Sequence, residues 1–95
     1  CNCSICRRYA SLWGHIDSSS VTITAAKDAT VAYVHGDKSL AFHSCKTCGC
    51  TTHWEGLPPG EEGPMAVNFH MCKKEDIDRF RIRDFDGADT WAFFD

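Results

Sequence analysis

The sequence has little of what would place it in a membrane or on a nucleic acid. Its 95 residues contain no apolar run long enough to span a bilayer, so no membrane partner is expected. Ten lysines and arginines are outnumbered by 13 aspartates and glutamates, and the net charge of -3 argues against a nucleic-acid partner. Repeats, low-complexity tracts and long linkers are also absent, and we therefore expect one small domain over residues 1–95.

Cysteine, by contrast, is abundant and clustered. Five of the seven cysteines fall in two motifs, C-N-C-S-I-C at Cys1, Cys3 and Cys6, and C-K-T-C-G at Cys45 and Cys48. A disulfide across C-x-C would be strained, and an odd number of cysteines leaves one unpaired. The spacing therefore favours metal binding over disulfides, and it indicates a reducing, cytoplasmic environment.

Each motif suits a zinc ion in a different way. C-x-x-C followed by glycine is a turn that presents two thiolates to one ion. C-x-C-x-x-C places three thiolates within one turn, and three protein ligands leave a tetrahedral ion one open position for chemistry. A bound metal ion also stabilises a domain of this size, because its hydrophobic core is small, so we predict up to two Zn²⁺ ions. The predicted ligands are Cys1, Cys3, Cys6, Cys45 and Cys48.

The hydrophobic pattern predicts a mainly β, antiparallel fold with one short helix beside the first cysteine motif. Ser4 is the expected N-cap of that helix, and Gly14 is expected to end it. The helix is expected over 5–12, strands over 21–24, 31–34, 40–43, 51–54 and 65–71, a helical turn over 75–80, and a last strand over 81–85. The strands before and after Cys45 and Cys48 form a hairpin with the cysteines at its tip.

The chain resembles the glutathione-dependent formaldehyde-activating enzyme family, which includes the centromere protein V type of domain. The matching segments are C-N-C-S-I-C-R-R-Y, F-H-S-C-K-T-C-G-C, A-V-N-F-H-M and F-D-G-A-D-T-W, in this order and covering nearly the whole chain. The resemblance implies a small, zinc-stapled β-tent type fold with two metal sites. It also implies a carbon–sulfur lyase activity, in which glutathione and formaldehyde condense to S-hydroxymethylglutathione, so that the partner is a small-molecule thiol substrate.

The resemblance further implies that Cys1, Cys3 and Cys6 form the catalytic site and that Cys45 and Cys48 belong to a four-cysteine structural zinc. The other two structural ligands, a C-x-C on an earlier strand, do not occur in this sequence. We expect them in an N-terminal segment ahead of Cys1. Two alternatives are that Cys50, His43 or Cys72 completes the site, or that Cys1 and Cys3 join Cys45 and Cys48 in one site.

Two further functions compete with the lyase. In the first, the protein is a non-catalytic binding module that zinc stabilises. In the second, Cys45 and Cys48 are a redox pair that forms a reversible disulfide. For the enzyme, Arg7 and Arg8 directly follow the last ligand of the first motif, and we expect a guanidinium there either to offset thiolate charge or to bind a substrate carboxylate. Cys50 and Cys72 are expected to be buried as small apolar side chains.

Overall fold

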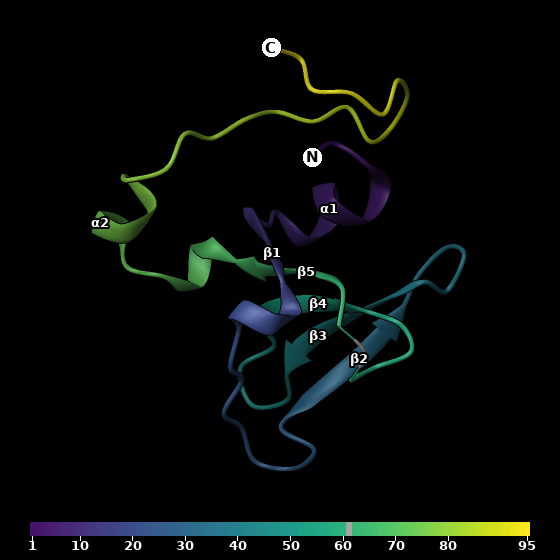
Figure 1. Cartoon of the computed structure of the whole chain (residues 1–95), viewed down its shortest axis with the longest axis vertical. Helices are drawn as coiled ribbons and strands as arrows, with labels where there is room; N and C mark the ends of the chain where they lie inside the picture. The colour runs from purple at the N-terminus through teal and green to yellow at the C-terminus, as the bar shows by residue number, and fades with distance from the viewer. Residues whose placement is uncertain (61) are drawn as a thin grey trace.

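One antiparallel sheet of five strands, in the order β1-β5-β4-β3-β2, is the frame of the protein (Figure 1). The computed structural model describes residues 1–60 and 62–95. The elements are α1 (Ser4–Tyr9), β1 (Trp13–Asp17), η1 (Ser18–Ser20), β2 (Thr30–Val34), β3 (Leu40–Cys45), β4 (Thr51–Gly56), β5 (Pro64–Asn68), η2 (Phe69–Met71) and α2 (Lys74–Ile77). The predicted mainly β, antiparallel fold with a short helix is confirmed.

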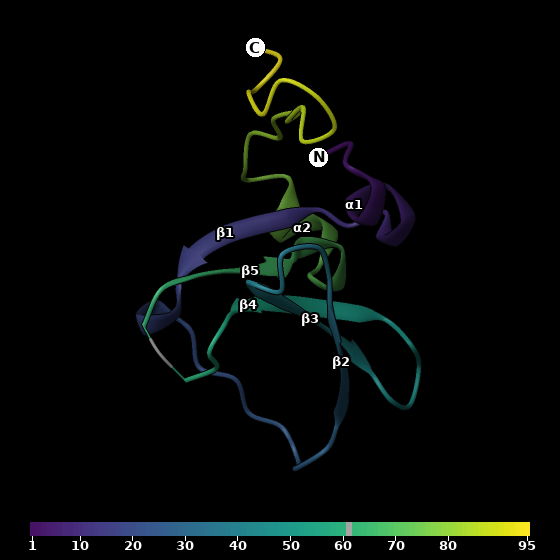
Figure 2. The ribbon, with the colours of Figure 1, turned by 90° about the vertical axis from the view of Figure 1, so that its right-hand side faces the viewer.

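The hairpin formed by β3 and β4 is the centre of the sheet, as Figure 2 shows. Its strands pair Phe42 with Trp54 and His43 with His53, and a register shift follows at Ser44. Because successive side chains of a strand point to opposite faces, Phe42 and Trp54 share one face and the two histidines share the other. The hairpin therefore presents an apolar face and a polar face.

The apolar face carries the core of the protein. Phe42, Trp54 and Ala66 form one buried cluster, and Ala66 is completely inaccessible to solvent. Helix α1 contributes Ile5 and Tyr9 to this cluster, and the Tyr9 ring centroid lies 5.5 Å from that of Phe42. The core therefore fixes α1, and with it the first cysteine motif, against the sheet.

The N-terminal strand differs from the sequence prediction. Residues 13–17 form β1, which pairs along its whole length with β5, whereas the predicted strand over 21–24 is irregular. Gly14 was expected to end a helix but lies inside β1, because α1 already ends at Tyr9 with Ala10 in the left-handed conformation at φ 50°. Cys3, not Ser4, is the N-cap residue, and it makes no side-chain capping bond.

The C-terminal segment also differs from the prediction. The expected strand over 81–85 is replaced by a single bridge between Phe85 and Phe93, and the expected helical turn is the four residues of α2. Trp91 in this segment is 72% exposed, and its ring lies edge-on to that of Phe85 at a centroid distance of 5.1 Å. The predicted strand over 65–71 ends at Asn68 and continues as η2.

Candidate metal centre

The first cysteine motif folds so that its three thiols converge. Cys3 is extended, and the first turn of α1 begins directly after it, with the Arg7 amide donating to the Cys3 carbonyl at 2.9 Å. The sulfur atoms of Cys1, Cys3 and Cys6 all lie within 4.8 Å of one another. Three sulfurs bound tetrahedrally to zinc, with Zn–S bonds of about 2.3 Å, are separated by roughly 3.8 Å. The three side chains therefore fit a metal ion with small adjustments.

Burial distinguishes Cys6 from the other two thiols of this motif. Desolvation raises the pKa of the Cys6 thiol to about 11, and the neighbouring Cys3 contributes in the same direction. The Trp13 indole opposes this shift, since its Nε1–H donates to Cys6 Sγ at 3.3 Å. A cation bound to the three sulfurs replaces the thiol proton, and the Trp13 bond then stabilises the thiolate.

The C-terminal loop is tied to the first residues of the chain, and Figures 1 and 2 show the two segments side by side. Asn2 Nδ2 donates to Asp86 Oδ1 at 3.0 Å, and the Ala88 amide donates to Asn2 Oδ1 at 3.0 Å. The Asn2 amide also donates to the Phe85 carbonyl at 3.2 Å. Asp86 is buried, and the bonds from Asn2 and Thr90 lower the pKa of its carboxyl. This loop therefore holds Cys1 and Cys3 in place.

Gly87 is the point where the loop lies closest to the sulfurs. A Cβ atom at this position would lie 2.6 Å from Cys1 Sγ and 3.2 Å from Cys3 Cβ. A free Cys1 side chain can rotate away from such an atom, whereas a metal-bound one cannot. Glycine at this position therefore suits a motif whose thiols are held by an ion.

Replacing Gly87 with alanine is expected to weaken zinc binding by about tenfold, the lower end of the range for residues that support metal ligands. The stability of the metal-free protein should change little, because Cys1 can then rotate. Competition titrations with a zinc chelator and thermal unfolding without metal measure the two effects. Gly63→Ala is the matched control, since nothing lies within 4 Å of its Cβ position. Equal zinc affinities for Gly87→Ala and Gly63→Ala would contradict this prediction.

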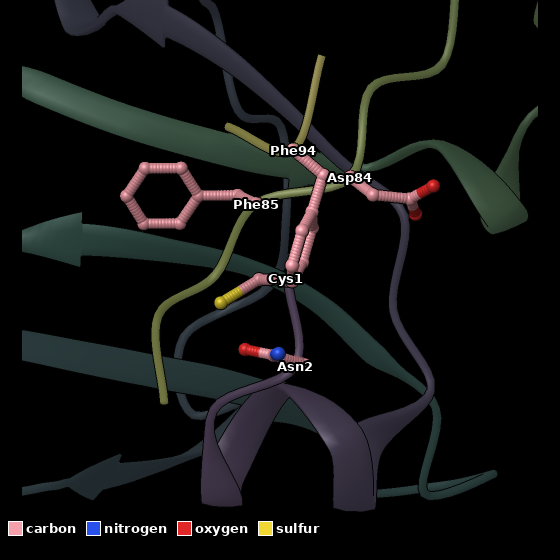
Figure 3. A pocket seen from close by; sticks show the side chains of 5 residues that line it. All are labelled: Cys1, Asn2, Asp84, Phe85 and Phe94. Atoms are coloured by element: carbon pink, nitrogen blue, oxygen red, sulfur yellow. The ribbon is translucent and has the colours of Figure 1, made fainter. Parts of the chain in front are cut away.

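A cavity of about 340 Å³ adjoins the thiol of Cys1. Figure 3 shows the side chains that line it, which are Cys1, Asn2, Asp84, Phe85 and Phe94. Two aromatic rings give the cavity apolar walls, and Asp84 is the carboxylate among these five residues. The cavity therefore gives a small molecule access to Cys1.

The two arginines after the motif lie on the exposed surface of α1. Arg8 Nη1 donates to the Ser4 carbonyl at 2.8 Å, within its own helix. Arg8 also lines a second cavity, of about 350 Å³, together with Tyr33 and His35. Neither arginine lines the cavity beside Cys1, so their expected contact with a substrate carboxylate stays a prediction.

The second cysteine motif forms a tight turn at the tip of the hairpin. The Gly49 amide donates to the Cys45 carbonyl at 2.8 Å, and Gly49 has a φ of +80°, which favours glycine. The amides of Cys48 and Thr47 bond to the Cys45 thiol and, with the Cys48 side chain, lower its pKa. The turn therefore stabilises a thiolate at Cys45, as a metal ligand requires.

Among residues 1–60 and 62–95, no third cysteine, histidine or carboxylate joins Cys45 and Cys48 in a cluster within 4.8 Å. Cys50 bonds to Cys48 but does not complete a group of three, and Cys72 lies elsewhere, after η2. Both are exposed rather than buried as expected, because the hairpin tip and η2 lie outside the core. Cys1 and Cys3 converge with Cys6 rather than with Cys45 and Cys48. All seven cysteines are free thiols in the structure.

Sequence patterns did not reveal the residues that support the first motif. Asn2 and Asp86 are 84 positions apart, and no spacing rule connects them. The segment F-D-G-A-D-T-W entered only through the family resemblance, and nothing in it indicates that its glycine lies beside Cys1. Trp13 gave no sequence signal, because its bond to Cys6 depends on the unexpected strand β1.

No helix in the described part of the chain has the length and apolar character needed to cross a membrane. The group of Cys1, Cys3 and Cys6 can hold a metal ion on geometric grounds. Comparisons of this chain with family models, with curated proteins and with solved structures find no match in any of the three.

Proposed function

We propose that this protein is a zinc-dependent carbon–sulfur lyase of the glutathione-dependent formaldehyde-activating family. The observation that carries this proposal is the convergence of Cys1, Cys3 and Cys6 beside a cavity open to solvent. Three cysteine ligands leave one coordination position free, and the cavity provides access to it. The proposed substrates are glutathione and formaldehyde, and the product is S-hydroxymethylglutathione.

The role of the metal in this proposal is limited to the thiol. A zinc ion held by the three cysteines supplies a positive centre that favours the thiolate form of a fourth thiol at neutral pH. The glutathione sulfur uses its electron pair to form a bond to the formaldehyde carbon. The carbonyl π electrons move to oxygen, which takes up the proton that the thiol has lost. Atoms and charge balance without any further reactant.

The residues of the chain hold and orient the reactants. Phe85 and Phe94 line the cavity, where they can contact the small apolar part of the adduct. Asp84 lines the same cavity, and we assign to it the transfer of the proton from the thiol to the product oxygen. Asn2, between Cys1 and Cys3, bonds to Asp86 and Ala88 of the C-terminal loop, and Gly87 of this loop lies close to the Cys1 sulfur.

An exchange measurement tests the proposal. Nuclear magnetic resonance exchange spectroscopy at equilibrium reports how fast glutathione and S-hydroxymethylglutathione interconvert in the presence of formaldehyde. The zinc-loaded protein is expected to increase this rate by about tenfold over buffer, equivalent to about 1.4 kcal/mol of barrier, because the uncatalysed addition is already fast. Cys6→Ser should remove both the increase and one equivalent of zinc.

The matched control is Cys72→Ser, which changes an exposed cysteine outside the cluster and should keep both zinc and activity. Asp84→Asn should lower the rate with the zinc content unchanged. A fully zinc-loaded wild-type protein that exchanges no faster than buffer would overturn the enzymatic proposal.

A non-catalytic, zinc-stabilised binding module is the second candidate. It is favoured by the exposed aromatic side chains of the C-terminal segment, where Trp91 is 72% and Phe94 66% exposed. Such side chains are typical anchors of protein interfaces. If the protein is such a module, Cys6→Ser should unfold or loosen the domain. The exchange rate of glutathione should not change, because the wild-type protein would not accelerate it either.

A further inference from the structure

A second cluster of metal-binding side chains lies on the other face of the sheet from α1. It consists of His43 on β3 and of His53 and Glu55 on β4. His43 and His53 are paired across the two strands, and Glu55 follows two residues later on the same face. One ligand atom from each of the three side chains lies within 4.8 Å of the others. The strands themselves therefore bring these three donors together.

The hydrogen bonds of His53 leave one ring nitrogen free to bind a cation. Thr52 Oγ1 donates its hydrogen to the His43 carbonyl at 3.3 Å. The same oxygen lies 2.8 Å from His53 Nδ1, and since its hydrogen is already used, it accepts from Nδ1–H. His53 Nε2 is then the unprotonated nitrogen, with its lone pair available. Among the described residues, the structure gives no hydrogen bond to this atom.

His43 is oriented by a second threonine. Its Nδ1 lies 2.8 Å from Thr30 Oγ1 on β2, and its Nε2 lies 2.5 Å from Glu55 Oε2. In each of the two rings, a threonine hydroxyl bonds to Nδ1. A hydrogen bond to the nitrogen that does not bind the metal fixes the orientation of histidine ligands in metal sites. The Nε2 atom of His43 therefore faces Glu55.

The sheet partly shelters this cluster from solvent. His53 is buried, and its ring stacks on that of His43. The side chains of His43 and Glu55 are 17% and 29% exposed, so the cluster is sheltered but open to solvent at one side. An ion can therefore enter without unfolding of the sheet.

We propose that His43, His53 and Glu55 form a site for a divalent first-row transition cation such as Zn²⁺, separate from the cysteine sites. Two imidazoles and one carboxylate are the ligand set of several catalytic zinc centres and of non-haem iron centres. The site carries a net charge of about +1 with the ion bound and Glu55 ionised. With three protein ligands, it also keeps positions for water or a further ligand.

The arrangement of the rings predicts how the site responds to an ion. The two imidazoles are stacked, with centroids 4.5 Å apart and an angle of 6° between their planes. A metal lies close to the plane of each histidine that binds it, so parallel rings cannot both bind one ion well. Binding must turn at least one ring about its Cβ–Cγ bond. If His43 and Glu55 formed only an ion pair, the His53 ring would not need to turn.

Cobalt and zinc titrations of the complete protein test the site. Cysteine-bound Co²⁺ gives a thiolate charge-transfer band, whereas Co²⁺ held by His43, His53 and Glu55 does not. Total bound Co²⁺ should fall by one equivalent in Glu55→Gln and in His53→Gln, while the charge-transfer intensity is unchanged. In a spectrum of ¹⁵N-labelled histidine, Zn²⁺ should shift the ring signals of His43 and His53 together.

His35→Gln is the matched control, because His35 belongs to the turn after β2 and contacts Tyr33 rather than the cluster. It should bind the same number of ions as the wild type. Glu55→Gln keeps the shape of a partly exposed side chain, so it tests the site even where His53→Gln fails to fold. Cys6→Ser should retain the histidine signal shifts, which separates this site from the proposed lyase centre. Equal metal content in wild type and Glu55→Gln, with ring signals that do not move, would overturn the proposal.

Discussion

Replacing Phe42 with alanine is expected to lower the free energy of unfolding by about 3–5 kcal/mol, the usual cost of removing a buried phenylalanine. Phe42 is 4% exposed and is the side chain through which α1 contacts the sheet. Its ring centroid lies 5.5 Å from that of Tyr9 and 5.9 Å from that of Trp13. The loss is large for a small domain, whose total stability is on the order of 5–15 kcal/mol.

The same change should also weaken metal binding, because Trp13 bonds to Cys6 and Tyr9 belongs to the helix that carries it. Urea unfolding and a zinc competition titration measure the two effects. Ile82→Ala is the control, because it shortens an apolar side chain that is 58% exposed and lines neither cavity. Its cost should be only a few tenths of a kcal/mol. Similar losses for the two variants would show that Phe42 does not anchor α1.

Replacing Gly14 with alanine is expected to destabilise the protein by about 1–2 kcal/mol. Alanine is usually favoured over glycine in a strand by about 0.5–1 kcal/mol. Here, however, the new Cβ would lie 2.6 Å from Cζ of Phe69, well inside van der Waals contact. Forcing a ring to move in a packed region costs about 1–3 kcal/mol, and we expect this effect to exceed the gain.

Thermal or urea unfolding of Gly14→Ala measures the balance of the two effects. Gly63→Ala serves as its reference, because there is open space around that position. The stability of Gly63→Ala should equal that of the wild type or be slightly higher. If Gly14→Ala were as stable as Gly63→Ala, then the Phe69 ring would not restrict β1.

Local patterns predicted the central part of the fold well. Leu40 to Phe42 is an apolar run, Thr51 to Trp54 contains two β-branched threonines and a tryptophan, and residues 44–50 between these segments contain three cysteines and a glycine. Because both signals are short in sequence, they identified the hairpin of β3 and β4. The spacing of Cys1, Cys3 and Cys6 likewise indicated convergence, since one helical turn brings such positions together.

The parts that could not be predicted depend on contacts between distant residues. Strand β1 exists because it pairs with β5, about 50 residues later, and its own sequence contains a glycine and a histidine that weaken the strand signal. The segment 21–24 has a better alternation but no strand beside it to pair with. The cluster of His43, His53 and Glu55 was hidden for the same reason, because cross-strand neighbours depend on the register of the hairpin.

The attachment of Asp86 and Gly87 to the first three residues has a consequence for biosynthesis. The ribosome makes Cys1, Cys3 and Cys6 about 80 residues before the loop that contacts them. Until that loop is made, these three sulfurs lack its contacts and are open to the surrounding pool of ions and oxidants. Capture of a metal at this stage would protect them, so the cellular supply of that metal would determine how much of the newly made protein matures intact.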